Sequence, residues 1–249
     1  MLELKNIASG YGNKNILREI TVSFEKGKLT SVIGVNGCGK STLLKSILGI
    51  LPLSNGEILL DGNDLCAMNR MDIAKKIAYL SQGKNTPDMT VWQMVLHGRF
   101  PYLSYPRRYN ASDREMARKA MDATGILHLA DQQLYELSGG MRQNAYIAMA
   151  LAQDTDYILL DEPTTYLDIT HQIALMKLLR KLADAGKGII MVMHDLPLAF
   201  DFSDMIVAIQ NGTIISCGTP SEMFDSPVIH EMFGVRMERI KNNKFYCNY

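Results

Sequence analysis

The chain has 249 residues, 47% hydrophobic and 21% charged, so it can bury a core without disulfide or metal support. Its 26 basic residues balance its 26 acidic ones, which argues against nucleic acid as the main partner, because binding a phosphate backbone usually needs a basic excess. The four scattered cysteines contain no C-x-x-C pair and are typical of a reduced, cytosolic protein.

The amino-terminal residues lack the apolar core of a signal peptide, and we expect none. No apolar run approaches the ~20 residues of a membrane helix. The longest runs, such as 188–193, have the length of buried strands. If the protein works at a membrane, other chains must span it.

The first third of the chain predicts strands followed by a loop and a helix. Residues 2–7 and 20–24 alternate and turn like antiparallel strands. The apolar run 29–33 leads into a glycine-rich loop, and apolar residues then recur at helical spacing over 40–50.

The rest of the chain predicts a helical block followed by alternating strands and helices. Residues from about 90 to 152 have helical character, with N-cap candidates at 110–113. Apolar strands separated by helices then imply a parallel sheet covered on both faces. The predicted strands are 157–160, 188–193 and 205–209, and the predicted helices are about 169–185 and near 196.

These elements together predict one α/β domain over residues 1–249 with an antiparallel β portion. The core should occupy about 1–85 and 154–218. A helical subdomain at about 86–153 should be inserted into it, and a helical tail should follow at about 219–249.

Residues 34–42, GVNGCGKST, match the phosphate-loop pattern G-x-x-x-x-G-K-[ST] between a predicted strand and a predicted helix. Glycines let the backbone curl so that its N–H groups converge on phosphates, and the helix N-terminus adds positive potential. Lys40 would reach the β- and γ-phosphates, and the Ser41 hydroxyl would bind Mg²⁺. Cys38 is expected only to pack, because the loop acts through its backbone. The candidate nucleotide-binding residues are Gly34, Asn36, Gly37, Cys38, Gly39, Lys40, Ser41 and Thr42.

Two carboxylates, Asp161 and Glu162, follow the apolar strand 157–160. The carboxyl edge of a parallel sheet is where such folds bind ligands, so both side chains should lie beside the phosphate loop. Asp161 would hold Mg²⁺ through its water shell, and Glu162 would act as general base toward the attacking water. The pattern is weak alone and becomes specific when paired with the phosphate loop.

The sequence Leu-Ser-Gly-Gly at 137–140 resembles the signature motif of the ATP-binding-cassette (ABC) ATPases, which other P-loop enzymes lack. Ser138 and the amides of Gly139 and Gly140 would start a helix reaching about residue 152, forming a second anion-binding helix N-terminus. The resemblance implies that this end faces the γ-phosphate held by another subunit. Met141 departs from the Gln or Glu of many relatives, and a thioether is a poor hydrogen-bond partner.

Further positions match the family in order over about residues 2–218. The resemblance implies that Tyr11 stacks on adenine and that Gln82 senses Mg²⁺ and the γ-phosphate as a catalytic and metal-site residue. It implies that Asp168 crosses a dimer interface and that His194 contacts the γ-phosphate and orients the water.

The segments 98–101, 147–153 and 161–172 resemble the iron-chelate uptake branch, which comprises siderophore, haem and cobalamin importers of prokaryotes. His171 has no second ligand at useful spacing, so a metal role is not expected for it. The resemblance implies ATP and Mg²⁺ as cofactors, and a homodimer of ATPase subunits. It also implies polytopic membrane permease partners, an indirect substrate-binding protein, and a place at the cytoplasmic face of the membrane.

The alternative class is an ABC ATPase without a transporter, such as a DNA-repair, translation or iron–sulfur assembly clamp. Repair clamps usually contain a long coiled coil and translation factors usually carry two cassettes, and this sequence has neither feature. An iron–sulfur assembly role remains open. A structural protein with an inactive site is disfavoured because every catalytic position is filled.

Overall fold

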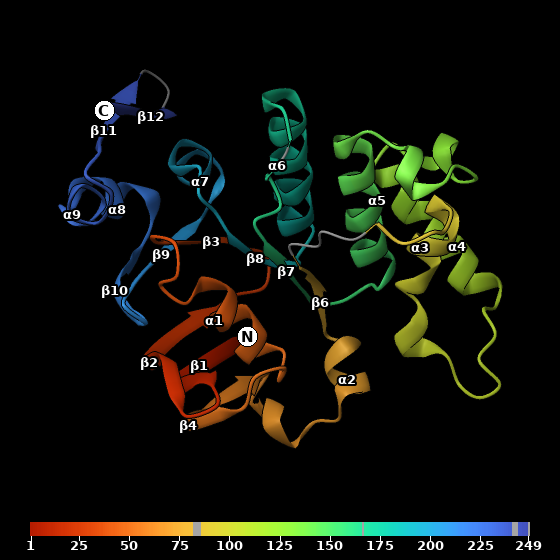
Figure 1. The fold of residues 1–249 in the computed structure, drawn as a ribbon, viewed down its shortest axis with the longest axis horizontal. Coiled ribbons are helices and arrows are strands. Elements are labelled where there is room, and N and C mark those ends of the chain that lie inside the picture. The colour runs from red at the N-terminus through yellow and green to blue at the C-terminus, as the bar shows by residue number, and fades with distance from the viewer. Residues whose placement is uncertain (82–85, 166, 241–243, 249) are drawn as a thin grey trace.

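A six-stranded sheet forms the centre of the fold in the computed structural model, which describes residues 1–81, 86–165, 167–240 and 244–248 (Figure 1). Five of its strands are parallel, and the strand at one edge is antiparallel. The strand order is β10 (Thr213–Gly218), β9 (Met205–Gln210), β3 (Leu29–Ile33), β8 (Gly188–Val192), β7 (Tyr157–Asp161) and β6 (Ile77–Leu80).

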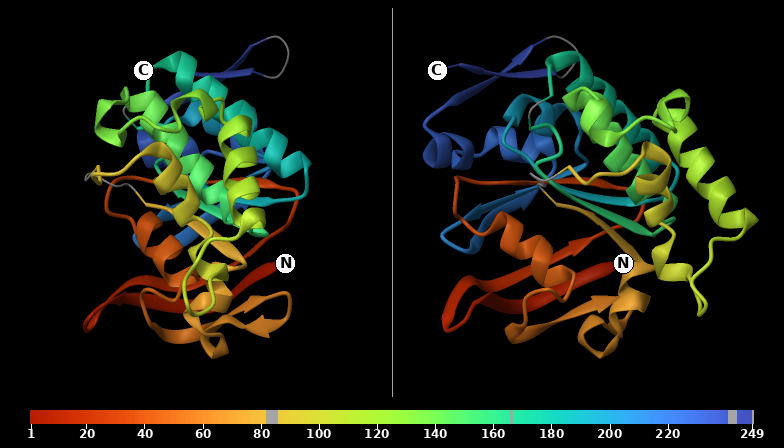
Figure 2. Two further views of the ribbon diagram at one scale, coloured as in Figure 1. Left: turned by 90° about the vertical axis from the view of Figure 1, so that its right-hand side faces the viewer. Right: turned by 45° about the vertical axis from the view of Figure 1, so that its right-hand side comes forward.

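The central strands are continuously apolar because both faces of this sheet are covered. Every residue of β3, β7 and β8 is buried. On one face lie four helices whose apolar residues share a core with the sheet (Figure 2). They are α6 (Ile169–Asp184), α7 (Leu196–Phe202), α8 (Pro220–Asp225) and α9 (Val228–Phe233).

A second, antiparallel sheet lies against the other face, with α1 (Lys40–Ile47) in the shared core between them. Its strands alternate buried and exposed residues, as expected for a sheet with one solvated face. Leu43, Leu44 and Ile47 of α1 join residues of both sheets in one apolar cluster. The strand order is β2 (Lys14–Phe24), β1 (Leu2–Tyr11), β4 (Leu53–Leu60) and β5 (Asn63–Asp64).

Between β6 and β7 the chain forms a helical block with an apolar cluster of its own. Its helices are α3 (Val91–His97), α4 (Ala111–Ala123) and α5 (Gly139–Ala152). Asn110 caps α4 through a reciprocal capping box with Asp113, as the sequence predicts. The short helix α2 (Arg70–Ala74) precedes β6, and 3₁₀ turns lie at Leu65–Ala67, Phe100–Tyr102, Leu127–Leu129 and Leu134–Glu136.

The predicted strands, helices and antiparallel β portion are present, and the fold class is confirmed. The tail at about 219–249 differs from the prediction, which is for helices alone. After α8 and α9 it continues as an antiparallel hairpin of β11 (Arg236–Ile240) and β12 (Lys244–Asn248). Their sequences, RMERI and KFYCN, show neither strict alternation nor an apolar run that spans the strand, so no strand pattern stands out.

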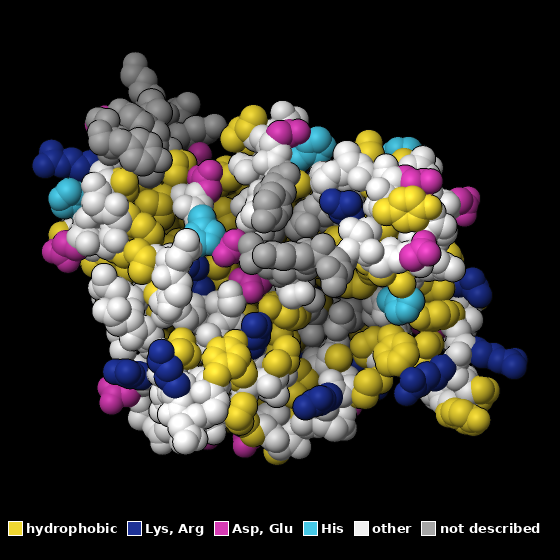
Figure 3. Space-filling model, viewed as in Figure 1, with side chains coloured by type: hydrophobic (Ala, Val, Ile, Leu, Met, Phe, Trp, Pro, Cys, Tyr) yellow, Lys and Arg dark blue, Asp and Glu magenta, His cyan; other side chains and the backbone are white. Residues whose placement is uncertain are grey.

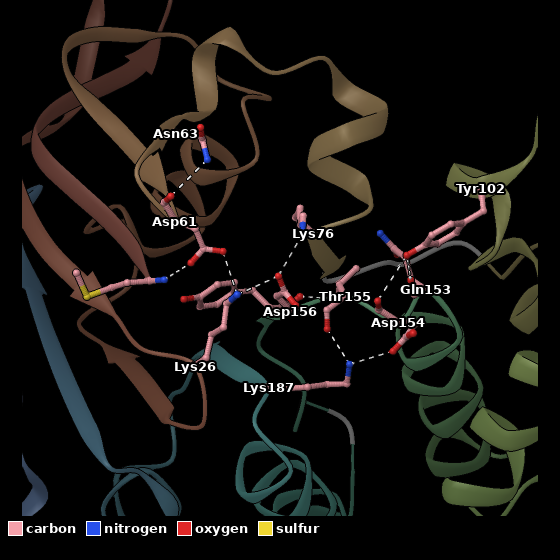
Figure 4. A network of polar contacts seen from close by, with 12 residues as sticks. Lys26, Asp61, Asn63, Lys76, Tyr102, Gln153, Asp154, Thr155, Asp156 and Lys187 are labelled. Atoms are coloured by element: carbon pink, nitrogen blue, oxygen red, sulfur yellow. Dashed lines mark hydrogen bonds and ion pairs between the residues drawn. The ribbon is translucent and has the colours of Figure 1, made fainter.

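A network of polar contacts ties the helical block to both sheets (Figure 4). The Lys26 ammonium lies 3.0 Å from Asp61 Oδ2 and 3.1 Å from Asp156 Oδ2. Further along, the hydroxyl of Tyr102 donates to the backbone oxygen of Gln153, at 2.9 Å. The Gln153 amide in turn donates to backbone oxygens that flank the start of β6. The carboxyl end of α5 is therefore anchored to the core.

An ion pair between Arg99 and Asp113 is buried in the helical block. Its Nε–Oδ1 distance is 3.1 Å, and the two side chains are 10% and 4% exposed. Arg99 also donates to the backbone oxygen of Ala152, 2.9 Å away, and its guanidinium carbon lies 3.9 Å from the ring centroid of Tyr102. This one side chain joins α4, the last residue of α5 and the loop between α3 and α4.

Arg99→Met should lower the free energy of unfolding by about 3 kcal/mol or more, because it leaves the Asp113 carboxylate buried without its cation. Arg118→Met is the matched control, since Arg118 pairs with Glu115 on the same helix with both side chains about half exposed. The control should lose far less, because solvent screens an exposed ion pair. Chemical denaturation of both variants measures the difference, and equal losses would contradict the structural role given to Arg99.

Candidate active site

Three loops meet at the carboxyl edge of the parallel sheet. The strand register aligns Val32 with Val192, and Val192 with Asp161, so β3, β8 and β7 end side by side. The phosphate-loop sequence follows β3, Glu162 follows β7, and His194 comes two residues after β8. Residues more than 150 positions apart in the chain are thereby brought to one place.

The glycines of the phosphate loop are required by backbone conformation and by close contacts. Gly37 and Gly39 have φ angles of 78° and 114°, where side chains are disfavoured. A Cβ atom at Gly34 would lie 2.3 Å from the backbone oxygen of Ile209 and 2.6 Å from the sulfur of Cys38. Cys38 is buried against this turn, and burial raises the pKa of its thiol. Its contacts agree with the packing role expected for it.

A cavity of about 240 Å³ lies over the loop and the start of α1. The Lys40 ammonium is buried beneath it and donates to the backbone oxygens of Gly34, at 2.7 Å, and Val35, at 3.1 Å. Ile16 also lines the cavity, and sequence reasoning missed it because nothing distinguishes it from other apolar strand residues. The lining residues are Tyr11, Ile16, Asn36, Gly37, Gly39, Lys40, Ser41, Thr42 and Glu162.

Asp161 lies between two hydroxyl groups beside this cavity. Ser41 Oγ donates to its Oδ1, at 2.9 Å, and the Tyr79 hydroxyl is 3.4 Å from its Oδ2. Burial is the main cause that raises the pKa of Asp161, and the nearby charge of Glu162 raises it further. A hydroxyl and a carboxylate are hard oxygen donors, so this pair fits Mg²⁺. Tyr79 was missed because it lies inside a predicted strand.

Glu162 is held at both carboxylate oxygens. His194 Nε2 donates to Oε1, at 2.7 Å, and the Thr165 hydroxyl donates to Oε2, at 3.2 Å. The residue has a φ of 52°, in the left-handed region that non-glycine residues rarely adopt. Such strain persists where the surroundings enforce it, often at functional sites. A fixed carboxylate facing the cavity can accept a proton from a water molecule.

The start of α5 is not among the residues that line this cavity. Ser138 caps the helix, and its Oγ accepts from the backbone N–H of Met141, at 3.3 Å. Asp168 caps α6 in the same way, accepting from the backbone of His171 at 2.9 Å. Ser138, Gly139, Gly140 and Asp168 therefore form a second group of candidate residues outside the cavity. Gln82 lies outside the residues that the structure describes.

The face that carries these loops shows basic side chains along its lower part, separated by apolar and uncharged ones (Figure 3). Over its described residues, this face has no continuous basic stripe. Among the helices of the described part of the chain, none combines the length and apolar character needed to span a bilayer.

The family model described as ABC transporter matches residues 17–165, more than half of the chain. The petrobactin import ATP-binding protein FpuD of Bacillus anthracis is 46% identical over 239 residues, which is 95% of this chain and 87% of that protein. The ferric enterobactin transport ATP-binding protein FepC of Escherichia coli (strain K12) is 41% identical over 93% of this chain and 86% of that protein.

The fold is also similar to solved structures. An inward-facing ABC transporter described as of metal-chelate type superimposes with a TM-score of 0.85 and 26% identity, covering 100% of this chain and 97% of that one. A dimeric bacterial ABC transporter cassette gives a TM-score of 0.77 and 26% identity over 88% of this chain and 99% of that one. The resemblance noted in the sequence is confirmed: the chain belongs to the ABC transporter family and is an ATP-hydrolysing, ATP-binding subunit.

Proposed function

We propose that the chain is the motor subunit of an importer for a ferric siderophore. The observation that carries the motor role is the convergence of Lys40, Ser41, Asp161 and Glu162 on one cavity edge. The relatives named above for petrobactin and enterobactin support the substrate class over haem or cobalamin. Both relatives are named as import or transport proteins, which also favours the motor role over that of an iron–sulfur assembly clamp.

In this proposal the phosphate loop binds the triphosphate of ATP. The amides of residues 36–42 and the buried Lys40 ammonium meet the phosphate oxygens, and the exposed ring of Tyr11 stacks on adenine. Ser41 and Asp161 hold Mg²⁺, which when bound would neutralise charge on the phosphates. The short Ser41–Asp161 contact supports this assignment, because it brings two hard oxygen ligands together.

Hydrolysis is assigned to Glu162 and His194. A water molecule attacks the γ-phosphorus, its proton passes to the Glu162 carboxylate, and the bond to the departing ADP oxygen breaks. His194 donates to the carboxylate and keeps it oriented, while Thr165 holds the second oxygen. Gln82 is proposed to sense the γ-phosphate and Mg²⁺ from the segment between β6 and the helical block.

A dimer would complete the site. Ser138, Gly139, Gly140 and Asp168 lie outside the chain's own cavity, so we propose that they face the nucleotide bound by a second copy. The dimeric state of a related cassette supports this arrangement. The separate apolar cluster of the helical block supports its treatment as a subdomain, at about 86–153, inserted into the core.

The remaining partners follow from the import role. A polytopic permease would cross the membrane, a substrate-binding protein would deliver the chelate, and this chain would act at the cytoplasmic face. Closure of the ATP-bound dimer would drive the permease, and hydrolysis would reopen the dimer.

Lys40→Ala should weaken ATP binding at least about tenfold, which corresponds to about 1.4 kcal/mol, because it removes the cation aimed at the β- and γ-phosphates. Lys187→Ala is a matched control, since Lys187 precedes β8 at the opposite edge of the sheet and bonds to Thr155 and Asp154. Calorimetry should show near-normal affinity for the control. Unchanged affinity in a folded Lys40→Ala protein would refute the assignment of the loop.

Glu162→Gln should reduce ATP turnover by about 10²- to 10⁴-fold, because it removes the general base while keeping the shape of the side chain. The variant should still bind ATP and accumulate as a dimer, which chromatography with ATP and a phosphate-release assay would measure. Glu115→Gln, an exposed change on α4, serves as control. Turnover above about a tenth of wild type would exclude Glu162 as base.

Deletion of the gene should abolish high-affinity uptake of a ferric siderophore, measured with radiolabelled iron in iron-starved cells. The wild-type gene should restore uptake and the Lys40→Ala allele should not. Intact siderophore uptake in a strain without another motor subunit would reject the substrate class. Loss of haem or cobalamin uptake in its place would identify one of the other branches.

A further inference from the structure

His171 lies between Asp168 and the start of α5, the two parts of the candidate group outside the cavity. Its Nδ1 is 2.9 Å from both carboxylate oxygens of Asp168, and its backbone N–H donates to Oδ1 of the same residue. These hydrogen bonds lower the pKa of the Asp168 carboxyl. Because a carboxylate accepts, Nδ1 carries the proton in this contact.

The same imidazole ring packs against the start of α5. A Cβ atom at Gly140 would lie 2.7 Å from Cδ2 of His171 and 3.0 Å from its Cγ and Nε2. Gly140 does not have a left-handed φ, so backbone conformation alone does not require glycine there. A side chain at position 140 would require the ring of His171 to move.

Two other side chains bind the loop between Glu162 and α6. From α5, Gln143 donates to the backbone oxygen of Pro163, at 3.0 Å. From α6, Gln172 donates to the backbone oxygen of Leu167, at 3.1 Å. The start of α5, this loop and the start of α6 are thus linked by side chains that come from both helices.

Beyond His171 an open space separates part of α6 from the helical block. A cavity of about 720 Å³ lies between α6 and the helical block, lined by His171 together with Asn144, Leu178 and Lys181 among others. The contact between His171 and Gly140 therefore lies at the near end of an open space. It is well placed to set the separation of the two helix starts.

We propose that His171 is a positioning residue that couples Asp168 to the signature turn at Gly140. Its ring sets the position of the α5 start, and its Nδ1 fixes the Asp168 carboxylate. The α5 start and the carboxylate therefore keep a fixed relative position when they meet the second subunit. This inference rests on the proposed composite site of the dimer. A purely structural role is the alternative, but both side chains are about half exposed or more, 45% for His171 and 65% for Asp168, and such pairs contribute little to folding.

The test measures ATP-driven dimer formation in the Glu162→Gln background by light scattering. Added His171→Ala should raise the ATP concentration for half-maximal dimer about tenfold, a typical loss for one well-placed contact. ADP affinity of the single chain should change less than about twofold, because His171 does not line the phosphate-loop cavity. His171→Asn should recover part of the lost dimer formation, because its amide nitrogen can take the place of Nδ1 while its smaller side chain leaves the contact with Gly140 unfilled. His230→Ala, an exposed change on α9, should have no effect.

A double-mutant cycle tests the packing contact separately. Gly140→Ala should impair dimer formation when His171 is present and should impair it at least about threefold less when residue 171 is alanine. Equal effects in both backgrounds, or normal dimer formation by His171→Ala, would overturn the coupling. A fall in melting temperature of more than about 4 °C in His171→Ala would also overturn it in favour of a folding role.

The Glu162→Gln protein without a change at His171, the parent variant, distinguishes a failure of this inference from a failure of the proposed function. If Glu162→Gln alone forms no dimer with ATP, the composite site fails and the coupling fails with it. If the parent forms a dimer and His171→Ala forms it equally well, only the coupling fails.

Discussion

The register of the parallel sheet is the constraint on which the site depends. Because β3, β7 and β8 end at one edge, Lys40, Glu162 and His194 converge although they are far apart in sequence. A slip of one residue would move every side chain to the opposite face of the sheet, so the specific side-chain packing on the two faces fixes the register. The loops can then carry strain and charge because the strands beneath them contain only buried residues.

The helical block is attached unequally at the two ends of α5. At the carboxyl end, Gln153 donates to two backbone oxygens at the start of β6, and Arg99 and Tyr102 bond to the end of α5 from within the helical block. At the amino end the contacts come from a few side chains around Gly140 and Pro163, with a large cavity behind them. A rigid helix anchored this way transmits a small rotation at one end into a displacement at the other, which suits a segment that must meet a partner.

The parts of the site that could be predicted from the sequence are those with a local physical signature. Glycine spacing between a strand and a helix indicated the loop around Lys40, and an apolar run ending in two acids indicated Asp161 and Glu162. The roles of Ser138, Asp168 and His194 came from resemblance and remain proposals. Tyr79, Ile16 and the contact of His171 with Gly140 could not be predicted, because each depends on residues that only the fold brings together. The left-handed backbone of Glu162 likewise has no residue-type signal.

The two adjacent acids at the end of β7 also bear on how this chain responds to selection. Asp161 carries a charge that burial disfavours, and Glu162 sits in a backbone conformation that glycine or asparagine would adopt more readily. Under the proposed roles, replacements that relieve either cost remove a metal ligand or the general base. Screens for thermal tolerance therefore favour replacing these two residues, whereas screens for turnover favour keeping them, as is common at active sites. A library selected only for thermal tolerance would accumulate inactive chains through this one dipeptide.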